Sequence, residues 1–350
     1  MLPVLVVNAG STSLKLHVVH DDERVEVVED LDAVRPGEVG AVGHRVVHGG
    51  HLVEPTVIDA EVRESIEALA QVAPLHNAPA LAAIDDARRL LPTHPHVAVF
   101  DTAFHAGMPA EAATYAIPRT WREDWGIRRY GFHGLSVQWS AERAVELLGT
   151  EGARRLVVCH LGGGGSITAV GDGRSLDTTM GFTPLEGVPM ATRSGSVDPG
   201  ALLYVQRVHG LSVGDVDRAL NSESGVKGLS DGRDLRQLEA AASGDDTALL
   251  ALAVYTYRIA GAVSAMCAAL GGLDAVAFTA GVGEHSPAVR SAVCERLAFL
   301  GVRVDPDLNE RSAPDADIAA QGSGVRVLVI AAHEELVAAR AVRALLSAST

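Results

Sequence analysis

The sequence has few cysteines and few aromatic residues, and each shortage excludes a class of protein. Its three cysteines, Cys159, Cys267 and Cys294, lie far apart and form no CxxC pair. This spacing argues against a disulfide framework and against a structural zinc site, so we expect small buried side chains at these positions. Aromatic residues make up 4% of the chain and hydrophobic residues 47%. The core must therefore consist mainly of Val, Leu, Ala and Ile.

Basic residues are outnumbered by acidic ones. Lys and Arg together number 29 against 44 for Asp and Glu, which gives a formal net charge of −15. Proteins that bind nucleic acids carry a basic face, so we expect no nucleic-acid partner. The apolar content is normal and no low-complexity run is present, which excludes a disordered chain. Against this acidic background, basic residues inside glycine-rich motifs become the natural candidates for function.

Signals for export and for membrane insertion are also missing from the pattern. The N-terminal apolar run has no positive flank and stops at Asn8, which indicates a strand rather than a signal peptide. The longest apolar stretch, 248–270, is interrupted by Tyr255 and Arg258 and ends at Gly271. This pattern favours a buried or interface helix over a membrane span. We therefore expect a cytoplasmic protein with no membrane partner.

The length and the order of elements predict a two-domain α/β protein. At ~100–200 residues per domain, 350 residues correspond to two domains. Strand–glycine turn–strand units at 4–19 and 155–170 suggest an internal duplication. A third glycine unit has a strand at 275–279, a turn at 280–284 and a helix at 287–300, with Ser286 as its N-cap. Further expected strands are 41–47, 97–100 and 325–330; further expected helices are 60–71, 78–91, 137–148, 245–270 and 334–346.

The three glycine turns point to a ligand that carries several phosphates. Glycine-rich turns leave backbone N–H groups uncovered, and several such groups can converge on one anion. Common phosphate motifs are not met, because 162–166 lacks the lysine of a Walker loop and Ser286 stands where a dinucleotide motif needs its third glycine. The alternative for any single turn is a purely structural role.

Three charged residues end or follow apolar segments beside these turns. Arg45 and Asp101 stand at the ends of expected strands, and Arg193 lies in a loop of small residues. Catalytic groups of open α/β sheets gather at strand ends, and arginines with a carboxylate suit phosphoryl transfer. Each residue alone could equally form a structural salt bridge. The 14 histidines leave a zinc cluster as a further alternative, but none has an HExxH or CxxC context.

Nine motifs in order along almost the whole chain resemble those of the acetate kinases, which belong to the actin, sugar kinase and heat-shock ATPase superfamily. The motifs are VNAGSTSLK (7–15), GHRVVHGG (43–50), APLHN (73–77), FDTAFH (100–105), YGFHG (130–134), CHLGGGGSITAV (159–170), GFTPLEGVPMATRSGSVDPG (181–200), FTAGVGEHS (278–286) and HEEL (333–336).

The resemblance implies two ribonuclease H-like (actin-like ATPase) domains with a nucleotide cleft between them. It places an acetate-side domain at 1–104 plus 336–350 and a nucleotide-side domain at 105–335. It implies reversible transfer of the ATP γ-phosphoryl group to acetate, with Mg²⁺ as cofactor and Mn²⁺ able to substitute, in a homodimer. A carboxylate nucleophile is already ionised at pH 7 and needs no general base. Positioning and charge neutralisation can then supply the catalysis.

The resemblance also implies a role for individual residues. Arg45 and Arg193 would hold acetate and the transferring phosphoryl group, His133 would bond to that group, and Asp101 would position acetate or metal. Glu334 would hold Mg²⁺ through water, together with Asn8. The acetate methyl group would contact Val47, Leu75, Phe132 and Pro184. The nucleotide would contact Asn8, Ser11, Ser13, Lys15, His160, Gly162, Gly163, Gly164, Gly165, Asp231, Gly232, Arg233, Gly281, Val282, Gly283 and His285.

The chain departs from the family pattern at several positions. Gly163 stands where acetate kinases usually have Asn, and butyrate kinases share the His-Leu-Gly-Gly-Gly sequence. Gly232 replaces an aromatic residue in a shortened 226–232 segment, which removes part of the adenine wall. His285 and His333 stand where Asn is frequent, and the segment before Gly43 is short. Three alternatives therefore remain: a propionate or butyrate kinase, an acyl kinase with a donor other than ATP, and a non-catalytic phosphate sensor.

Overall fold

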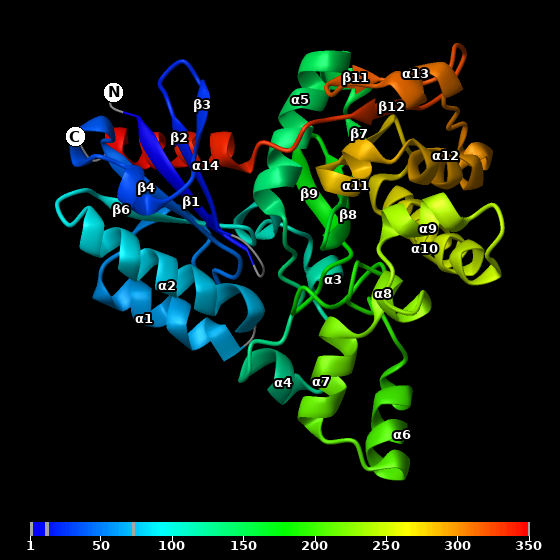
Figure 1. Ribbon diagram of the computed structural model, residues 1–350, viewed down its shortest axis with the longest axis horizontal. Coiled ribbons are helices and arrows are strands. Elements are labelled where there is room, and N and C mark those ends of the chain that lie inside the picture. Colours follow the sequence, from blue (N-terminus) through cyan, green and yellow to red (C-terminus); the bar gives the residue numbers. More distant parts are fainter. Residues whose placement is uncertain (1–2, 11–13, 72–73, 349–350) are drawn as a thin grey trace. The chain divides into compact units, whose positions relative to one another are not determined.

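The computed structural model describes residues 3–10, 14–71 and 74–348, and for residue 71 and residues 74–76 it describes only the backbone. The chain forms two compact units. Unit 1 comprises residues 1–106, 130–139 and 333–350, and unit 2 comprises residues 107–129 and 140–332. Each unit is built on a six-stranded sheet (Figure 1).

The sheet of unit 1 has the strand order β3-β2-β1-β4-β6-β5. β1, β4 and β6 are parallel and adjacent, and the other strands run antiparallel to their neighbours. Its central strands are almost fully buried and rich in Val, as expected of a sheet that is covered on both faces. The strands are β1 Val4–Ala9, β2 Leu14–Val19, β3 Val25–Val28, β4 Ala41–Val46, β5 Thr56–Val57 and β6 His96–Phe100.

Helices cover both faces of this sheet. Leu5 and Val7 belong to the same buried cluster as Ala83 of α2, which lies on one face (Figure 1). On the other face, α14 packs so closely that a Cβ at Gly43 would lie 2.9 Å from Val342. The helices of this unit are α1 Ala60–Ala68, α2 Pro74–Leu90 and α14 Glu334–Ala348, and α5 Gly134–Gly152 begins in this unit and continues into unit 2.

The sheet of unit 2 repeats the topology of the first. Its order is β11-β12-β10-β7-β8-β9. Read from the other edge, this is the order of the first sheet, with β7 to β12 in the places of β1 to β6. The parallel and antiparallel pairings also correspond. This agreement supports the internal duplication that the glycine turns predicted. The strands are β7 Arg155–Leu161, β8 Gly165–Gly171, β9 Arg174–Thr178, β10 Ala275–Thr279, β11 Ala316–Asp317 and β12 Arg326–Val329.

The longest helix of unit 2, α10 Asp246–Leu270, is long and apolar enough to cross a membrane by length and composition alone. It packs along β7 and β8, and Tyr255, Ile259 and Val263 are buried in the core beneath it. The expected helix is therefore confirmed, and one face of it packs in the core. The other helices of unit 2 are α3 Ala110–Ala113, α4 Arg119–Glu123, α6 Pro199–His209, α7 Val213–Ser222, α8 Gly225–Leu229, α9 Leu235–Ala241, α11 Ala280–His285, α12 Pro287–Arg296 and α13 Pro306–Arg311.

Two expectations from the sequence need correction. The segment 280–284 is not an open turn, because it folds into the short helix α11. The helix that starts after Ser286 ends at Arg296, and residues 298–300 form only a 3-10 turn. In the short segment before Gly43, residues 29–40, all of which the structure describes, form two 3-10 turns and otherwise extended or irregular backbone. Cys159 and Cys294 are buried, as expected, whereas Cys267 is only half-buried.

Candidate active site

Arg45 is the centre of a charged cluster at the carboxyl ends of the parallel strands of unit 1. Its Nε and Nη2 donate to Asp101 Oδ1 and Oδ2 at 2.9 and 2.6 Å, which is a bidentate pair. Its Nη1 donates to Asn8 Oδ1 at 3.0 Å and lies 3.0 Å from Glu334 Oε2. Asn8 Nδ2 donates to the same Glu334 oxygen at 3.0 Å. The structure thus brings together four predicted site residues.

The sheet register explains why these residues meet. Asn8 of β1 lies directly beside Arg45 of β4, and Asp101 follows the last residue of β6. The Asp101 N–H continues the ladder by donating to the Val46 carbonyl at 3.0 Å. Since parallel strands end at the same sheet edge, three chain segments deliver polar side chains to one place. Glu334 comes from the first residue of α14.

The cluster is largely buried and holds one cation between two carboxylates. Asp101 is fully buried, and the side chains of Arg45 and Glu334 are 13% and 15% exposed. Burial opposes the charge on Arg45, but attraction by Asp101 and Glu334 outweighs it and raises the pKa of Arg45 above its usual value. Arg45 therefore stays cationic at every working pH. A fixed, partly exposed guanidinium of this kind can orient a carboxylate and neutralise phosphoryl charge.

His133 is held next to this cluster by its neighbour. The Gly134 N–H donates to the Asp101 carbonyl at 3.0 Å, and a Cβ at Gly134 would lie 2.1 Å from that oxygen. Only glycine fits this approach of α5 to the end of β6. His133 itself has a positive φ of 60°, a conformation that non-glycine residues rarely adopt. Strained backbone at such a position is typical of functional residues.

Two of the four residues expected around the acetate methyl group are buried in unit 1. Val47 is 4% and Phe132 1% exposed. The ring of His48 packs against Phe132 with a centroid distance of 5.5 Å, which brings the two segments together. The side chain of Leu75 lies outside the described residues, and Pro184 belongs to unit 2.

The second and third glycine segments meet at the ends of β7 and β10 in unit 2. His160 of β7 pairs in register with Thr279 of β10. A Cβ at Gly162 would lie 3.6 Å from Ala280, and one at Gly283 would lie 3.5 Å from the Cys159 carbonyl. The two glycine segments therefore lie close together, as a shared phosphate-binding role requires.

A cavity of about 170 Å³ adjoins these segments. It brings together four residues that the sequence assigned to the nucleotide, Gly162, Gly232, Arg233 and Val282. Arg233 is fixed there by Asp245, whose Oδ2 accepts from Nη1 at 2.5 Å. The sequence interpretation missed the other lining residues, Ala191, Thr192, Val226, Lys227, Asp234, Leu235 and Tyr255. Tyr255 supplies an aromatic ring although Gly232 does not, and it stood out in the sequence only as an interruption of an apolar run.

Arg193, the second predicted catalytic arginine, is 8% exposed in unit 2. Its Nη1 donates to the Pro184 carbonyl at 3.2 Å and lies 3.9 Å from Met190 Sδ. Burial lowers the pKa of Arg193 from its usual value. A buried cation of this kind is suited to binding an anion, because the anion would relieve the cost of desolvation.

The remaining predicted residues differ in their exposure. Lys15 is exposed on β2 opposite Asn8, and Gly163 and Gly281 are exposed as well. Asp231, with a positive φ of 54°, and His285, whose Nδ1 lies 3.1 Å from the Gly281 carbonyl, are also exposed. Gly164 is half-buried and Gly165 buried. Ser11 and Ser13 lie outside the described residues.

The repeated sheet defines a protein with two ribonuclease H-like domains, the actin-like ATPase class of fold, as the sequence predicted. The chain belongs to the acetokinase family, whose sequence model matches residues 27–340. The resemblance noted in the sequence is thereby confirmed.

Relatives and solved structures agree with this assignment. An acetate kinase of Gloeobacter violaceus is 51% identical over 310 residues, which cover 87% of this chain and 76% of the relative. An acetate kinase of a Synechococcus strain is 50% identical over 313 residues, which cover 88% of this chain and 77% of the relative. The crystal structure of a Francisella tularensis propionate kinase has a TM-score of 0.90 at 34% identity, covering 97% of this chain and 99% of that one. The crystal structure of Porphyromonas gingivalis acetate kinase has a TM-score of 0.87 at 35% identity, covering 99% of this chain and 100% of that one.

Proposed function

We propose that this chain is an acetate kinase, which transfers the γ-phosphoryl group of ATP to acetate and forms acetyl phosphate and ADP reversibly. The observation that carries the proposal is the buried Arg45–Asp101 pair at the sheet edge, with Asn8 and Glu334 beside it. Membership of the acetokinase family and identities of about half with acetate kinases support this reading.

In the proposed reaction an acetate oxygen attacks the γ-phosphorus in line with the bond to the β,γ-bridging oxygen. The new bond makes acetyl phosphate, and the bridging oxygen leaves with ADP. Both reactants are anions, so the main task of the protein is to overcome their repulsion. Arg45 would hold the acetate carboxylate, Arg193 the phosphoryl oxygens, and His133 would donate a hydrogen bond to that group. Asp101 fixes the plane of the Arg45 guanidinium.

The donor set suits Mg²⁺, which prefers oxygen ligands. Asn8 Oδ1 and the Glu334 carboxylate supply oxygens, but both already interact with the Arg45 cation. We therefore propose that they hold the ion through water molecules rather than directly. Bound Mg²⁺ would neutralise charge on the ATP phosphates, and Mn²⁺ is expected to substitute.

The acceptor is the least constrained part of the proposal. Propionate and butyrate differ from acetate by one and two methylene groups, and one methylene is worth only about 1–3 kcal/mol of discrimination in an apolar pocket. The bulk of Val47 and Phe132 favours the smallest acceptor.

We further propose a cytoplasmic homodimer with domains at 1–104 plus 336–350 and 105–335.

Comparing acceptors and donors tests the proposal. Acyl phosphate is trapped as its hydroxamate, with acetate, propionate or butyrate as acceptor and ATP, GTP or pyrophosphate as donor. The expected result is the highest kcat/KM with acetate and ATP. A higher value with butyrate would reassign the acceptor, a higher value with pyrophosphate would reassign the donor, and no product with any pair would refute a kinase function.

A further inference from the structure

Tyr115, Arg129 and Glu186 form a connected polar cluster in unit 2 to which the proposed reaction gives no role. Arg129 Nη2 donates to Glu186 Oε1 at 3.0 Å, and the Tyr115 hydroxyl donates to Glu186 Oε2. The same hydroxyl accepts a hydrogen bond from the Phe182 N–H at 3.0 Å. The Arg129 guanidinium also lies over the Tyr115 ring, 5.4 Å from its centre. We call these three residues the Glu186 clamp.

The clamp fixes both ends of a short loop. At one end, Arg129 Nη1 donates to three successive backbone carbonyls at 2.9, 3.0 and 3.1 Å, those of Thr178, Thr179 and Met180. At the other end, Glu186 itself belongs to the loop. A Cβ at Gly181 would lie 1.7 Å from Glu186 Oε2 and 2.0 Å from the Tyr115 oxygen, so the clamp occupies the space of a side chain there. Residues 178–186 are thereby tied down from within unit 2.

Pro184 lies in the middle of this loop, and its carbonyl accepts the hydrogen bond from Arg193. The loop continues through Gly187, whose carbonyl accepts from the Ser196 N–H at 2.8 Å. Ser196 Oγ in turn accepts from the Gly187 N–H at 3.1 Å. Arg193 therefore lies in a backbone loop that is closed between 187 and 196. Its guanidinium bonds to Pro184 in the preceding segment, which the clamp holds.

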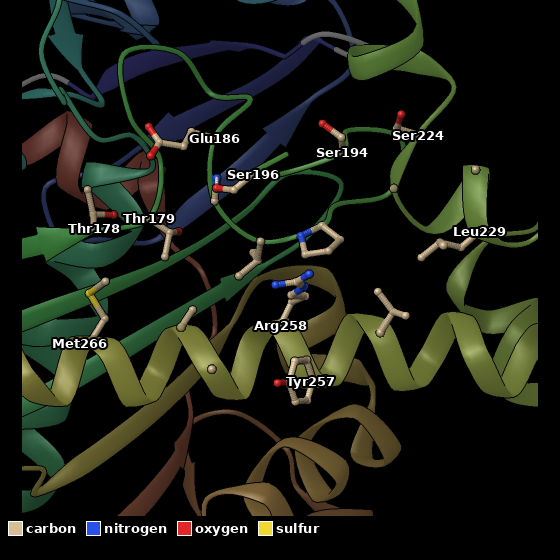
Figure 2. Close-up of a pocket in the computed structure, with 18 of the residues that line it drawn as sticks. Thr178, Thr179, Glu186, Ser194, Ser196, Ser224, Leu229, Tyr257, Arg258 and Met266 are labelled. Atoms are coloured by element: carbon tan, nitrogen blue, oxygen red, sulfur yellow. Dashed lines mark hydrogen bonds between the residues drawn. The ribbon is translucent and has the colours of Figure 1, made fainter. Parts of the chain in front are cut away.

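The clamp borders a cavity of about 790 Å³ on the side of the loop that faces α10. Figure 2 shows Thr178, Thr179 and Glu186 across this cavity from Tyr257 and Arg258 of α10. Open volume therefore lies beside the loop on this side. The polar bonds of the clamp tie the loop down where packing leaves it open.

We propose that the Glu186 clamp is a positioning device for Arg193: it holds the Pro184 carbonyl, and through it the guanidinium that stabilises the transferring phosphoryl group. The clamp residues are positioning residues rather than catalytic ones. This inference rests on the proposed function of Arg193.

The protonation of the clamp is consistent with a fixed device. Burial, followed by the hydrogen bond to the Glu186 carboxylate, raises the pKa of Tyr115 above its usual value. The hydroxyl therefore remains a donor throughout the working pH range. The two carboxylate oxygens of Glu186 accept hydrogen bonds from Arg129 and from Tyr115. A glutamine at this position would have only one such oxygen, so it could not accept from both partners equally well.

The test is the Glu186→Gln variant of the full chain, with Tyr115→Phe as a second variant should the first fail to fold. A shift of even ~1 Å in a catalytic group can cost about 10²-fold in rate. We expect kcat to fall by about 10–10²-fold, with the KM for ATP and the Tm close to those of the wild type. Glu223→Gln is the matched control, because Glu223 lines the same cavity but pairs with Arg218 on the surface. It should keep the wild-type kcat.

A double-mutant cycle with Arg193→Lys separates positioning from general stabilisation. If the clamp acts through Arg193, the fold-loss caused by Glu186→Gln should be much smaller in the Arg193→Lys background than in the wild type. An equal fold-loss in both backgrounds, an unchanged kcat, or a fall in Tm that accounts for the loss would overturn the inference. A wild-type chain that makes no acyl phosphate would instead refute the proposed function, so the two failures are distinguishable.

Discussion

At Arg45 one guanidinium joins three polar side chains that come from distant parts of the chain. Two of its nitrogens fork onto Asp101, and the third contacts Asn8 and Glu334. A planar fork can make these contacts together, whereas a lysine ammonium cannot match the bidentate geometry. The shape of Arg45, and not only its charge, is therefore part of the account.

Arg45→Lys should accordingly lower kcat/KM for acetate by at least ~10²-fold, because transition-state charge stabilisation depends on aligned donors. Steady-state kinetics with acetate as the varied substrate measure this. Arg63→Lys is the control, since Arg63 makes the same fork onto Asp85, at 2.9 and 2.7 Å, on the surface. Equal losses in the two variants would show that the fork at Arg45 has no special role.

Arg193→Ala should have a larger effect on rate than on folding. An arginine that stabilises transferring phosphoryl charge is worth ~10³–10⁵ in kcat. Because removing a buried cation also removes its desolvation cost, we expect the variant to keep its fold by circular dichroism and thermal melting. Retention of the full rate would remove Arg193 from the proposed site.

At the scale of elements, β4 and β6 share a pair of buried histidines. His44 Nε2 lies 2.9 Å from His96 Nδ1, and His96 Nε2 donates to the Leu91 carbonyl at 3.1 Å. Burial, with smaller effects of His96 and Arg88, lowers the pKa of His44 to about 3. Burial also lowers the pKa of His96. Both rings are therefore neutral at pH 7.

This pair predicts a loss of stability in mild acid. A histidine with a lowered pKa in the folded state contributes fully above its unfolded pKa of about 6.5, and the contribution is lost as pH falls toward the folded value of about 3. The free energy of unfolding should fall between pH 6.5 and 5 by up to about 1.4 kcal/mol per pH unit for each such group. His105, with a pKa lowered by burial to about 4, adds to the effect.

Urea unfolding across this pH range measures the slope. His44→Gln should flatten it, although His96 and His105 remain. His51→Gln, at an exposed histidine, should leave the slope as it is in the wild type. Parallel curves for wild type and His44→Gln would contradict the assignment of the pH dependence to the buried pair.

The approach of α5 to β6 makes a second prediction at this scale. Gly134→Ala would place a Cβ 2.1 Å from the Asp101 carbonyl oxygen, so the helix or the strand end must move. Overpacking of this kind costs ~1–3 kcal/mol, and here it also displaces Asp101 and His133. We expect a lower Tm in thermal melts together with a fall in kcat. Gly107→Ala, where a Cβ meets nothing within 4 Å, is the control that should change neither.

Elements were predictable from the sequence where local signals were strong. The strand at 275–279 and the start of α12 at Pro287, capped by Ser286, match the structure. Helices α6 to α9 were missed because 199–241 is rich in Gly, Ser and Asp. Two of them do carry a capping signal, the pairs Ser212 with Asp215 and Asp234 with Gln237. The 280–284 turn was misjudged because its two glycines suggest a loop.

Among the site residues, those on strand ends could be placed from the sequence because parallel strands share an edge. Asn8, Arg45 and Asp101 are of this kind. Tyr255 and the Glu186 clamp could not be foreseen, because their contacts join segments far apart in sequence and follow no local pattern. The roles of all these residues, and the expected domain limits, stay predictions.

At the scale of the whole molecule, one topology appears twice and carries two kinds of site. Unit 1 presents an arginine–carboxylate cluster, and unit 2 presents glycine-rich backbone and a small cavity. This division matches a reaction with one small carboxylate and one nucleotide as substrates.

The central claim is direct phosphoryl transfer from ATP to acetate. Phosphorus NMR of the purified chain with ATP, acetate and Mg²⁺ tests it in one experiment. The account predicts that acetyl phosphate and ADP appear in equal amounts, and that adding acetyl phosphate to ADP regenerates ATP. Formation of inorganic phosphate without acetyl phosphate, or unchanged ATP in the presence of acetate, would contradict it.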